Sequence, residues 1–300
     1  MHGVLVVDKP QRLTSHDVVA AARRLLGESR IGHTGTLDPM ATGVLPLAIG
    51  RATRLVRFLS ASDKEYDATI RFGVTTDTYD VTGTETSRTG VTPDIDAVMR
   101  GLDALRGDYL QMPPPYSAKK VEGQRAYDLA RAQRDVTLAS VPVRVSKLEL
   151  LDVSGATARV TLTCSAGFYV RSFAHALGEM TGTGAALDAL RRTRSGDFSL
   201  QDAVGLDALD EGRGASRVLP MEALLRDIPA VTLTPRGRDH VTHGRELSPQ
   251  DFTPEPFALT PAPFRLAPEW TRLLDAEGAL VGVATAGTGP DSLHPSLVLI

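Results

Sequence analysis

Residues 32–46 (GHTGTLDPMATGVLP) hold one histidine and one carboxylate inside a heavily constrained backbone. Three glycines and two prolines occupy this segment. Glycine admits positive φ and close backbone approach, whereas proline fixes φ and lacks an N–H donor. The segment therefore predicts a rigid loop that presents His33 and Asp38. The ordinary alternative is that Asp38 only caps a helix beginning at Pro39, which is a frequent arrangement.

The glycine spacing of this loop fits neither the G-x-x-x-x-G-K-[ST] phosphate loop nor the G-x-G-x-x-G dinucleotide fingerprint. The whole segment instead resembles the signature loop of the TruB family of tRNA pseudouridine synthases, in which the aspartate is the catalytic residue. The resemblance continues in order through five more stretches and covers most of residues 1–200. These stretches are 62–66 (SDKEY), 76–80 (TDTYD), 114–120 (PPYSAKK), 164–171 (CSAGFYVR) and 189–192 (ALRR).

Chain length, hydrophobic content and cysteine count limit the kinds of protein that this sequence can form. A chain of 300 residues with 42% hydrophobic residues can build a substantial core, as one large domain or as a large and a small one. The single cysteine, Cys164, excludes internal disulfides and a multi-cysteine metal site, and it fits a reducing compartment. Asp8 and Lys9 interrupt the N-terminal apolar run, and no stretch has membrane-spanning length. We therefore expect a cytoplasmic protein without a membrane segment.

Charge is unevenly distributed along the chain. A net charge of −3 argues mildly against a nucleic-acid partner, because phosphate neutralisation supplies much of such affinity. Residues 1–60, however, carry eight Lys and Arg against four Asp and Glu, and residues 116–134 carry five against two. Residues 201–300 carry eight against fourteen. Positive charge is thus concentrated near the candidate site.

Hydrophobic periodicity predicts an α+β fold. Strands are expected at 4–7, 66–72, 141–153 and 158–164, and helices at 15–26, 52–59, 94–107, 124–134 and 168–180. Thr14 or Ser15 caps the first helix and Gly27 ends it. Alternation in the strand at 66–72 points Tyr66 inward, where most tyrosines are core residues with a hydrogen-bonded hydroxyl. Arg171 lies in the first turn of its helix, an unfavourable end for a cation, so an acidic partner is expected nearby.

Composition changes again near residue 228. Residues 248–268 hold six prolines, and the apolar stretches 280–284 and 297–300 read as strands. We expect a catalytic domain at 1–227, with a basic RNA-binding arm at about 108–140, and a small β-rich domain at 228–300. Its position suggests the PUA-like accessory RNA-binding domain found at the C-terminus of TruB-like proteins, although it carries no specific motif.

The family resemblance implies a fold and a reaction. The fold is the pseudouridine synthase fold, a mixed, largely antiparallel sheet flanked by helices. The reaction breaks the N1–C1′ bond of the uridine numbered 55 in the T loop of tRNA, turns the base and rejoins it through C5, with neither cofactor nor metal. In this reading Asp38 is the catalytic carboxylate, Arg171 is its ion-pair partner, and Tyr66 stacks on the flipped base and assists proton removal. Addition of the carboxylate to C1′ and removal of a sugar proton both remain open.

The resemblance also implies how the RNA is held. His33 enters the RNA loop and helps to hold the flipped arrangement, and Tyr169 and Leu190 complete the apolar pocket with Tyr66. Arg54 and Lys119 contact the RNA backbone, with the other basic residues of 51–57, 119–134 and 191–194. We expect tRNA as the partner and a monomeric enzyme.

Other classes of protein remain possible from the residues alone. A non-catalytic RNA-binding protein could keep the basic arm, but it would not need Asp38, Tyr66 and Arg171 together. A glycoside hydrolase uses a pair of carboxylates, and Asp38 has no evident acid partner in the sequence. A metal site is the weakest option, because His240 and His243 have helical ligand spacing without a third ligand.

Overall fold

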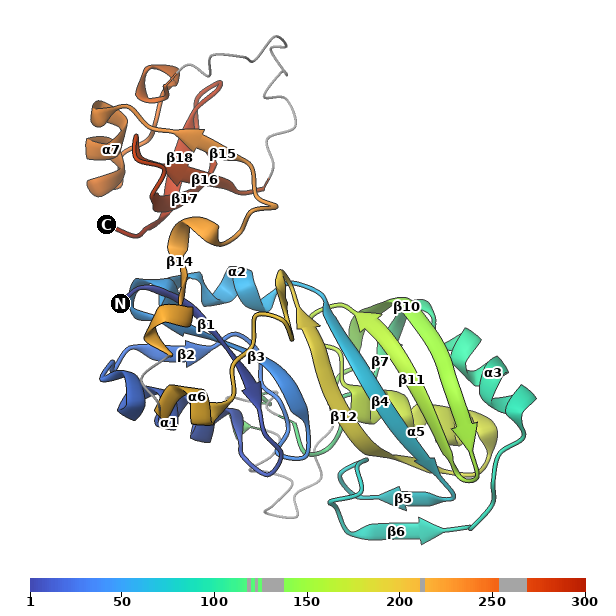
Figure 1. Cartoon of the computed structure of the whole chain (residues 1–300). Helices are drawn as coiled ribbons and strands as arrows, with labels where there is room; N and C mark the ends of the chain where they lie inside the picture. Colours follow the sequence, from blue (N-terminus) through green and yellow to red (C-terminus); the bar gives the residue numbers. More distant parts are fainter. Residues whose placement is uncertain (118–119, 122–123, 126–137, 211–213, 254–268) are drawn as a thin grey trace.

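The computed structural model describes residues 1–117, 120–121, 124–125, 138–210, 214–253 and 269–300 (Figure 1). The larger sheet contains β1 (Gly3–Lys9), β2 (Ile31–His33), β3 (Thr42–Ile49), β4 (Lys64–Phe72), β7 (Gly107–Gln111), β10 (Val141–Ser154), β11 (Thr157–Cys164), β12 (Ala185–Ser195), β13 (Phe198–Ser199) and β14 (Leu219–Pro220). Its strand order is β14-β1-β3-β12-β4-β11-β10-β7, with β2 beside β3 and β13 beside β12. The β3–β12 pair is parallel, whereas its neighbours β1–β3 and β4–β12 are antiparallel. The predicted α+β fold with a mixed sheet is confirmed.

Helices flank this sheet. They are α1 (Ser15–Leu26), α2 (Val56–Ser60), α3 (Ile95–Ala104), α5 (Val170–Thr181), α6 (Leu206–Asp210) and the 3₁₀ turns η1 (Gly50–Leu55), η2 (Ala215–Arg217) and η3 (Met221–Ala223). The predicted ends of α1 are confirmed, since Thr14 forms a capping box with Asp17 and Gly27 adopts a left-handed φ of 63°. Helix α5 begins two residues later than predicted, because Tyr169 is its extended N-cap. Arg171 still lies in the first turn.

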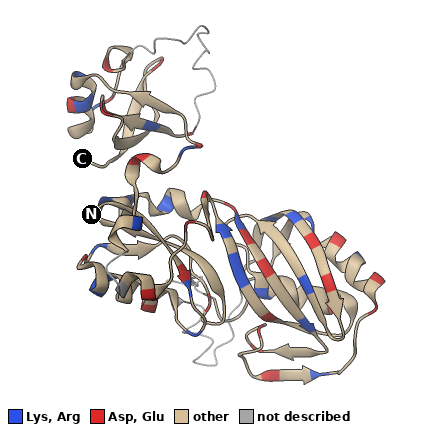
Figure 2. Ribbon diagram, in the orientation of Figure 1, with Lys and Arg blue, Asp and Glu red and all other residues tan. Residues whose placement is uncertain are grey.

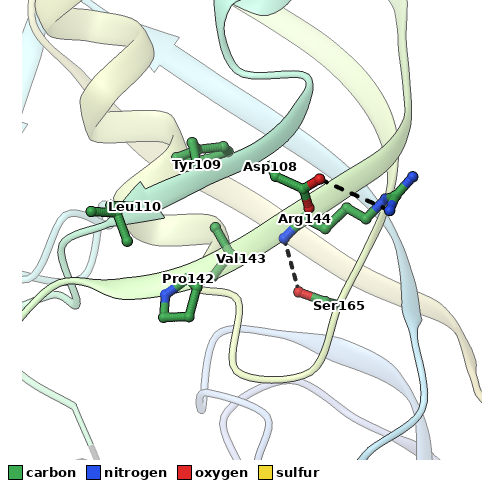
Figure 3. A pocket seen from close by; sticks show the side chains of 7 residues that line it. All are labelled: Asp108, Tyr109, Leu110, Pro142, Val143, Arg144 and Ser165. Carbon is green, nitrogen blue, oxygen red and sulfur yellow. Dashed lines mark hydrogen bonds and ion pairs between the residues drawn. The ribbon is translucent and has the colours of Figure 1, made fainter.

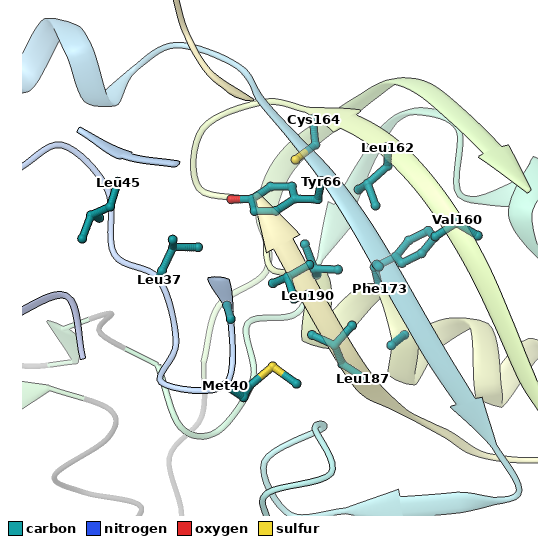
Figure 4. Packing of buried hydrophobic residues seen from close by; sticks show 14 of the residues in the cluster. Leu37, Met40, Leu45, Tyr66, Val160, Leu162, Cys164, Phe173, Leu187 and Leu190 are labelled. Carbon is teal, nitrogen blue, oxygen red and sulfur yellow. The ribbon is translucent and has the colours of Figure 1, made fainter. Parts of the chain in front are cut away.

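The main hydrophobic core lies between the sheet and the helices. Leu5 and Val7 of β1, Ile70 of β4 and Phe173 of α5 belong to one cluster of fully buried residues. Figure 4 shows side chains of the loop after β2 in the same cluster as those of β4, β11 and β12. The core of the larger sheet therefore continues into the loop that carries Asp38.

Two pairs of short antiparallel strands form small sheets of their own. One consists of β5 (Val74–Thr76) and β6 (Glu85–Arg88), and the other of β8 (Lys120–Val121) and β9 (Gln124–Arg125). The helix predicted at 124–134 is wrong at its start, because residues 124–125 pair as a strand. Lys119 and the rest of that segment lie outside the described residues.

The C-terminal part forms a second sheet of its own. It consists of β15 (Ala230–Thr232), β16 (Thr271–Leu274), β17 (Leu280–Ala286) and β18 (Leu293–Val298), with α7 (Pro235–Thr242) and η4 (Pro249–Asp251) beside it. The predicted strand at 280–284 is confirmed. The strand predicted at 297–300 was placed four residues too late at its start, because His294 and Ser296 alternate with buried positions and obscure the apolar run.

The C-terminal part adjoins the rest of the chain near β14 and α2 (Figure 1). Leu280, Val283 and Leu299 belong to the same buried cluster as Val4 and Val6 of β1. Phe58 and Trp270 meet edge to face across this junction, at a ring distance of 4.9 Å, and the Arg57 guanidinium lies over both rings. No helix in the described part of the chain has the length and apolar character needed to cross a membrane.

Candidate active site

The loop between β2 and β3 carries Asp38, and it is anchored on both sides of this residue. Leu37 and Met40 are 3% and 6% exposed and pack into the main core (Figure 4). The Ala41 N–H donates to the Asp38 carbonyl at 3.0 Å, which closes a turn, and β3 begins at Thr42. No helix follows Asp38, so the interpretation of this residue as a helix cap is wrong.

Asp38 forms a two-point ion pair with Arg171. Arg171 Nε donates to Asp38 Oδ2 at 2.9 Å, and Nη2 donates to Oδ1 at 3.1 Å. The arginine side chain is 8% exposed, whereas the carboxylate is 33% exposed. A paired guanidinium and carboxylate in this fork geometry fix each other's orientation. The acidic partner predicted for Arg171 is thus Asp38, and one side of its carboxylate stays open.

The other donors of Arg171 bind the surrounding backbone. Nη1 donates to the Thr78 carbonyl at 3.0 Å, and Nη2 donates to the Tyr116 carbonyl at 2.9 Å. A second carboxylate, that of the buried Asp80, lies 3.8 Å from Nε. Sequence reasoning missed Asp80, although it belongs to the TDTYD stretch that resembles the family. Asp80 Oδ1 also accepts hydrogen bonds from the Thr78 hydroxyl and the Thr82 N–H, which hold the loop closed.

Asp38 opens into a pocket of about 650 Å³. The pocket is lined by six residues predicted for the site, namely His33, Asp38, Tyr66, Tyr169, Arg171 and Leu190. Their elements are β2, the β2–β3 loop, β4, the start of α5 and β12. The structure therefore brings together residues that lie far apart in the sequence. Arg54 is not among the residues that line this pocket, and Lys119 lies outside the described residues.

Aromatic and imidazole side chains line the pocket beside Asp38 and Arg171. Burial raises the pKa of the Tyr66 hydroxyl, and the nearby Arg192 guanidinium opposes part of this shift. Burial likewise raises the pKa of Tyr169. It lowers the pKa of His33, and the neighbouring His16, whose ring lies 5.4 Å away, adds to this effect. Both phenols are thus protonated and His33 is uncharged at neutral pH.

Two buried cations, which sequence reasoning missed, also line the pocket. Arg192 is 1% exposed, and its guanidinium donates to the Val44 carbonyl at 2.7 Å and to the Gly35 carbonyl at 3.1 Å. Lys64 is 6% exposed and donates to the carbonyls of Ser60 and Ser62. Burial lowers the pKa of Lys64 to about 8. Because both cations bind backbone carbonyls, they hold the backbone around the pocket in place.

The expectation that residues 191–194 contact RNA phosphates is wrong for Arg192, which is buried. Its neighbour Arg191 is about 40% exposed and pairs with Asp8 at 2.8 Å. Arg54, expected to contact RNA, donates to the Val298 carbonyl of β18 and so lies at the junction of the two sheets. Figure 2 shows that acidic and basic residues are interspersed over the strands of the larger sheet. These arginines are therefore largely occupied by protein partners.

A second hollow of about 480 Å³ lies at the sheet edge formed by β7 and β10 (Figure 3). Asp108 and Arg144 approach within 3.9 Å there, and the Arg144 backbone N–H donates to Ser165 Oγ. None of the residues predicted for the site lines it. Its one ion pair, Asp108 with Arg144, is exposed to solvent, whereas Arg171 at Asp38 is buried, so the Asp38 pocket is the better candidate for chemistry.

His240 and His243, whose spacing made a metal site the weakest option, each lie beside an aspartate. His240 Nδ1 lies 3.3 Å from Asp251, and His243 contacts Asp239 on its own helix. Within the described ranges, no group of three or more His, Cys, Asp or Glu side chains could hold a metal ion.

Comparison with known proteins decides the family. The profile "TruB family pseudouridylate synthase (N terminal domain)" matches residues 23–170, and "tRNA pseudouridylate synthase B C-terminal domain" matches residues 171–226. The chain is 41% identical over its whole length to tRNA pseudouridine synthase B of Solibacter usitatus, which it covers completely. This chain belongs to the TruB family of pseudouridylate synthases. It is therefore an isomerase of uridine in RNA, and the predicted resemblance is confirmed.

A second TruB protein agrees with this assignment, and solved structures share the fold. The tRNA pseudouridine synthase B of Gloeobacter violaceus is 47% identical over 78% of this chain and 82% of its own length. The protein in a Cbf5–Nop10–Gar1 complex has a TM-score of 0.75 at 24% identity, and the match covers all of this chain and 85% of that one. An archaeal box H/ACA Nop10–Cbf5 complex gives a TM-score of 0.72. These structures support the fold.

Proposed function

We propose that this TruB-family protein converts uridine 55 in the T loop of tRNA to pseudouridine, acting as a monomer in the cytoplasm and without a cofactor. The observation that carries the proposal is the half-open carboxylate of Asp38, held at two points by Arg171 on the floor of an aromatic pocket. The curated relatives are named tRNA pseudouridine synthase B, which supports tRNA as the substrate.

Asp38 is the catalytic carboxylate in this proposal. The reaction needs a charged carboxylate at the sugar, either as a nucleophile or as a base. Arg171 keeps both oxygens of the carboxylate in a fixed direction, so the carboxylate is positioned before the substrate arrives. Its partial exposure leaves room for a ribose.

The pocket beside Asp38 would receive the extruded base. A flipped pyrimidine requires an apolar cleft with an aromatic stacking surface. Tyr66 provides this surface, with Tyr169 and Leu190 completing the pocket. Since burial keeps the Tyr66 phenol protonated at neutral pH, it is a weak base, and its stacking role is the better supported one. His33, which lines the pocket and is uncharged, would occupy the space in the RNA loop that the base leaves.

The accessory functions are assigned by position. We divide the chain into a catalytic domain at 1–227 and a PUA-like RNA-binding domain at 228–300. The separate second sheet supports this division, as does the end of the family profiles at residue 226. Lys119 and the basic arm would contact the RNA backbone. Arg54 would contribute only if RNA competes with its bond to the Val298 carbonyl.

The test is to map pseudouridine in unmodified tRNA after incubation with the purified protein. We expect one pseudouridine at position 55, and a T-stem-loop fragment should suffice as the substrate. Transcripts with cytidine at position 55 serve as the control. Release of free uracil would indicate a hydrolase, and tight binding without conversion would indicate an RNA-binding protein.

A further inference from the structure

The loop between β5 and β6 contains a bulky residue in an unfavourable backbone conformation. Tyr79 has a φ of 64°, in the left-handed region that residues other than glycine rarely adopt. Its N–H donates to the Thr76 carbonyl, and its own carbonyl accepts from the Leu187 N–H at 2.9 Å. Such a conformation persists only where surrounding contacts compensate for it, and such sites are often functional.

The compensating contact is a ring stack with helix α5. The rings of Tyr79 and His175 are almost parallel, at 4°, with centroids 3.9 Å apart. Buried Nδ1 of His175 has no hydrogen-bond partner among the described residues, so ring contact rather than hydrogen bonding holds the imidazole in place. His175 lies four residues after Arg171, and the two side chains therefore leave the same face of α5.

This face of α5 binds the loop at two points. Thr78, immediately before Tyr79, accepts a hydrogen bond from Arg171 at 3.0 Å. Asp80, immediately after it, places a carboxylate 3.8 Å from the same guanidinium. The residue in the strained conformation thus separates the two loop groups that flank Arg171. If the stack were lost, the loop could relax and both groups would shift relative to Arg171.

We propose that the Tyr79–His175 stack is a positioning contact for catalysis, which holds Thr78 and Asp80 against Arg171 and thereby orients Arg171 on Asp38. The inference rests on the proposed role of Asp38. Neither Tyr79 nor His175 is among the residues that line the Asp38 pocket, so in this proposal both act through Arg171. The competing explanation is that the stack only stabilises the β5–β6 hairpin.

The test measures single-turnover pseudouridine formation, tRNA affinity and thermal stability in one series of variants. We expect Tyr79→Ala and His175→Ala to slow the rate constant by roughly ten- to a hundredfold, the range for a small misplacement of catalytic groups, with tRNA affinity nearly unchanged. Tyr79→Phe and His175→Phe should keep near-parental rates, because they keep a stacking ring. The double alanine variant should be no slower than the worse single one.

Thr86→Ala is the matched control, because Thr86 bonds Thr75 within the same hairpin but does not touch the stack. The control should lose thermal stability only. Alanine variants of Tyr79 and His175 that behave in the same way would overturn the inference. Phenylalanine variants whose rate constants are as low as those of the alanine variants would overturn it too. If Tyr79→Ala does not fold, His175→Ala decides. The parental protein and Asp38→Asn, assayed alongside, report separately on the proposed function.

Discussion

Arg171 and Asp38 form a two-point ion pair in which the arginine is almost completely buried and the carboxylate keeps one side open to the pocket. The guanidinium is held in turn by two backbone carbonyls and by Asp80. Because the buried arginine holds both oxygens of Asp38, the direction of the carboxylate is fixed before substrate binds. Charge that is positioned in advance in this way lowers the barrier of the reaction.

The first prediction concerns Asp38→Asn. The amide is nearly isosteric, so the loop should survive, but it can neither act as a charged nucleophile or base nor pair with Arg171. We expect turnover to fall by several orders of magnitude, while tRNA affinity stays within roughly tenfold, about the effect of one altered polar contact. Single-turnover assays and a binding titration measure both. Asp103→Asn, in an exposed pair with Arg106, is the control, and near-parental conversion by Asp38→Asn would remove the catalytic assignment.

A second prediction concerns the buried Arg192. Its planar fork serves the carbonyls of Gly35 and Val44, on either side of Asp38. A lysine carries its three donors on one nitrogen and lacks the planar fork, so we expect it to leave one of these two carbonyls unsatisfied. An unsatisfied buried carbonyl costs about 1–3 kcal/mol. We expect Arg192→Lys to lower the free energy of unfolding by about this amount and also to slow turnover. Arg272→Lys, whose arginine binds the Ile228 carbonyl in the second sheet, should affect stability only. Equal rates in the two variants would show that Arg192 does not position the loop.

Lys64 predicts a dependence of stability on pH. Burial lowers its pKa to about 8 in the folded protein, from 10.5 in the unfolded chain. Between these pH values the unfolded chain binds more protons, so the contribution of Lys64 to the free energy of unfolding rises with pH, and below pH 8 it is constant. Relative to Lys64→Met, the parental Tm should therefore improve as pH is raised from 8 towards 10. Thermal denaturation across this range measures the difference. For the control Lys147→Met, at an exposed position, the difference in Tm from the parental protein should not change with pH. A difference for Lys64→Met that also stays constant with pH would contradict the expectation.

The basic arm at about 108–140 predicts how tRNA affinity depends on salt concentration. Neutralising Lys119, Lys120 and Arg125 together should weaken tRNA binding, because each phosphate contact releases counterions. The slope of log affinity against log salt should decrease in magnitude by roughly two to three. Titrations at several salt concentrations measure this slope. An unchanged slope would exclude the arm as a contact to the RNA backbone.

Truncation tests the proposed domain boundary. Because Leu280, Val283 and Leu299 pack with residues of β1, residues 1–227 alone should expose part of a buried cluster. We expect this fragment to fold with a lower Tm and to retain uridine isomerisation with weaker tRNA affinity. Calorimetry and the pseudouridine assay decide. An aggregated fragment would mean that the two sheets form one inseparable core.

The sequence alone determined the local features of this protein. The glycines and prolines of residues 32–46 predict a rigid loop around Asp38, and the periodicities and caps predict α1, β4 and the β10–β11 pair, because these depend on neighbouring residues. The unfavourable position of Arg171 in the first turn of its helix also predicted an acidic partner. The family resemblance then identified that partner and the chemistry.

Only the tertiary structure decided which distant residues meet. Arg171 is 133 positions from Asp38, and Asp80 and His175 join the same network through the path of the chain over the sheet. Arg192 reads as an exposed cation in the sequence, yet the parallel pairing of β12 with β3 buries it beneath the Asp38 loop. Strand order and burial are properties of the whole packing, because each depends on contacts between segments that no local pattern specifies.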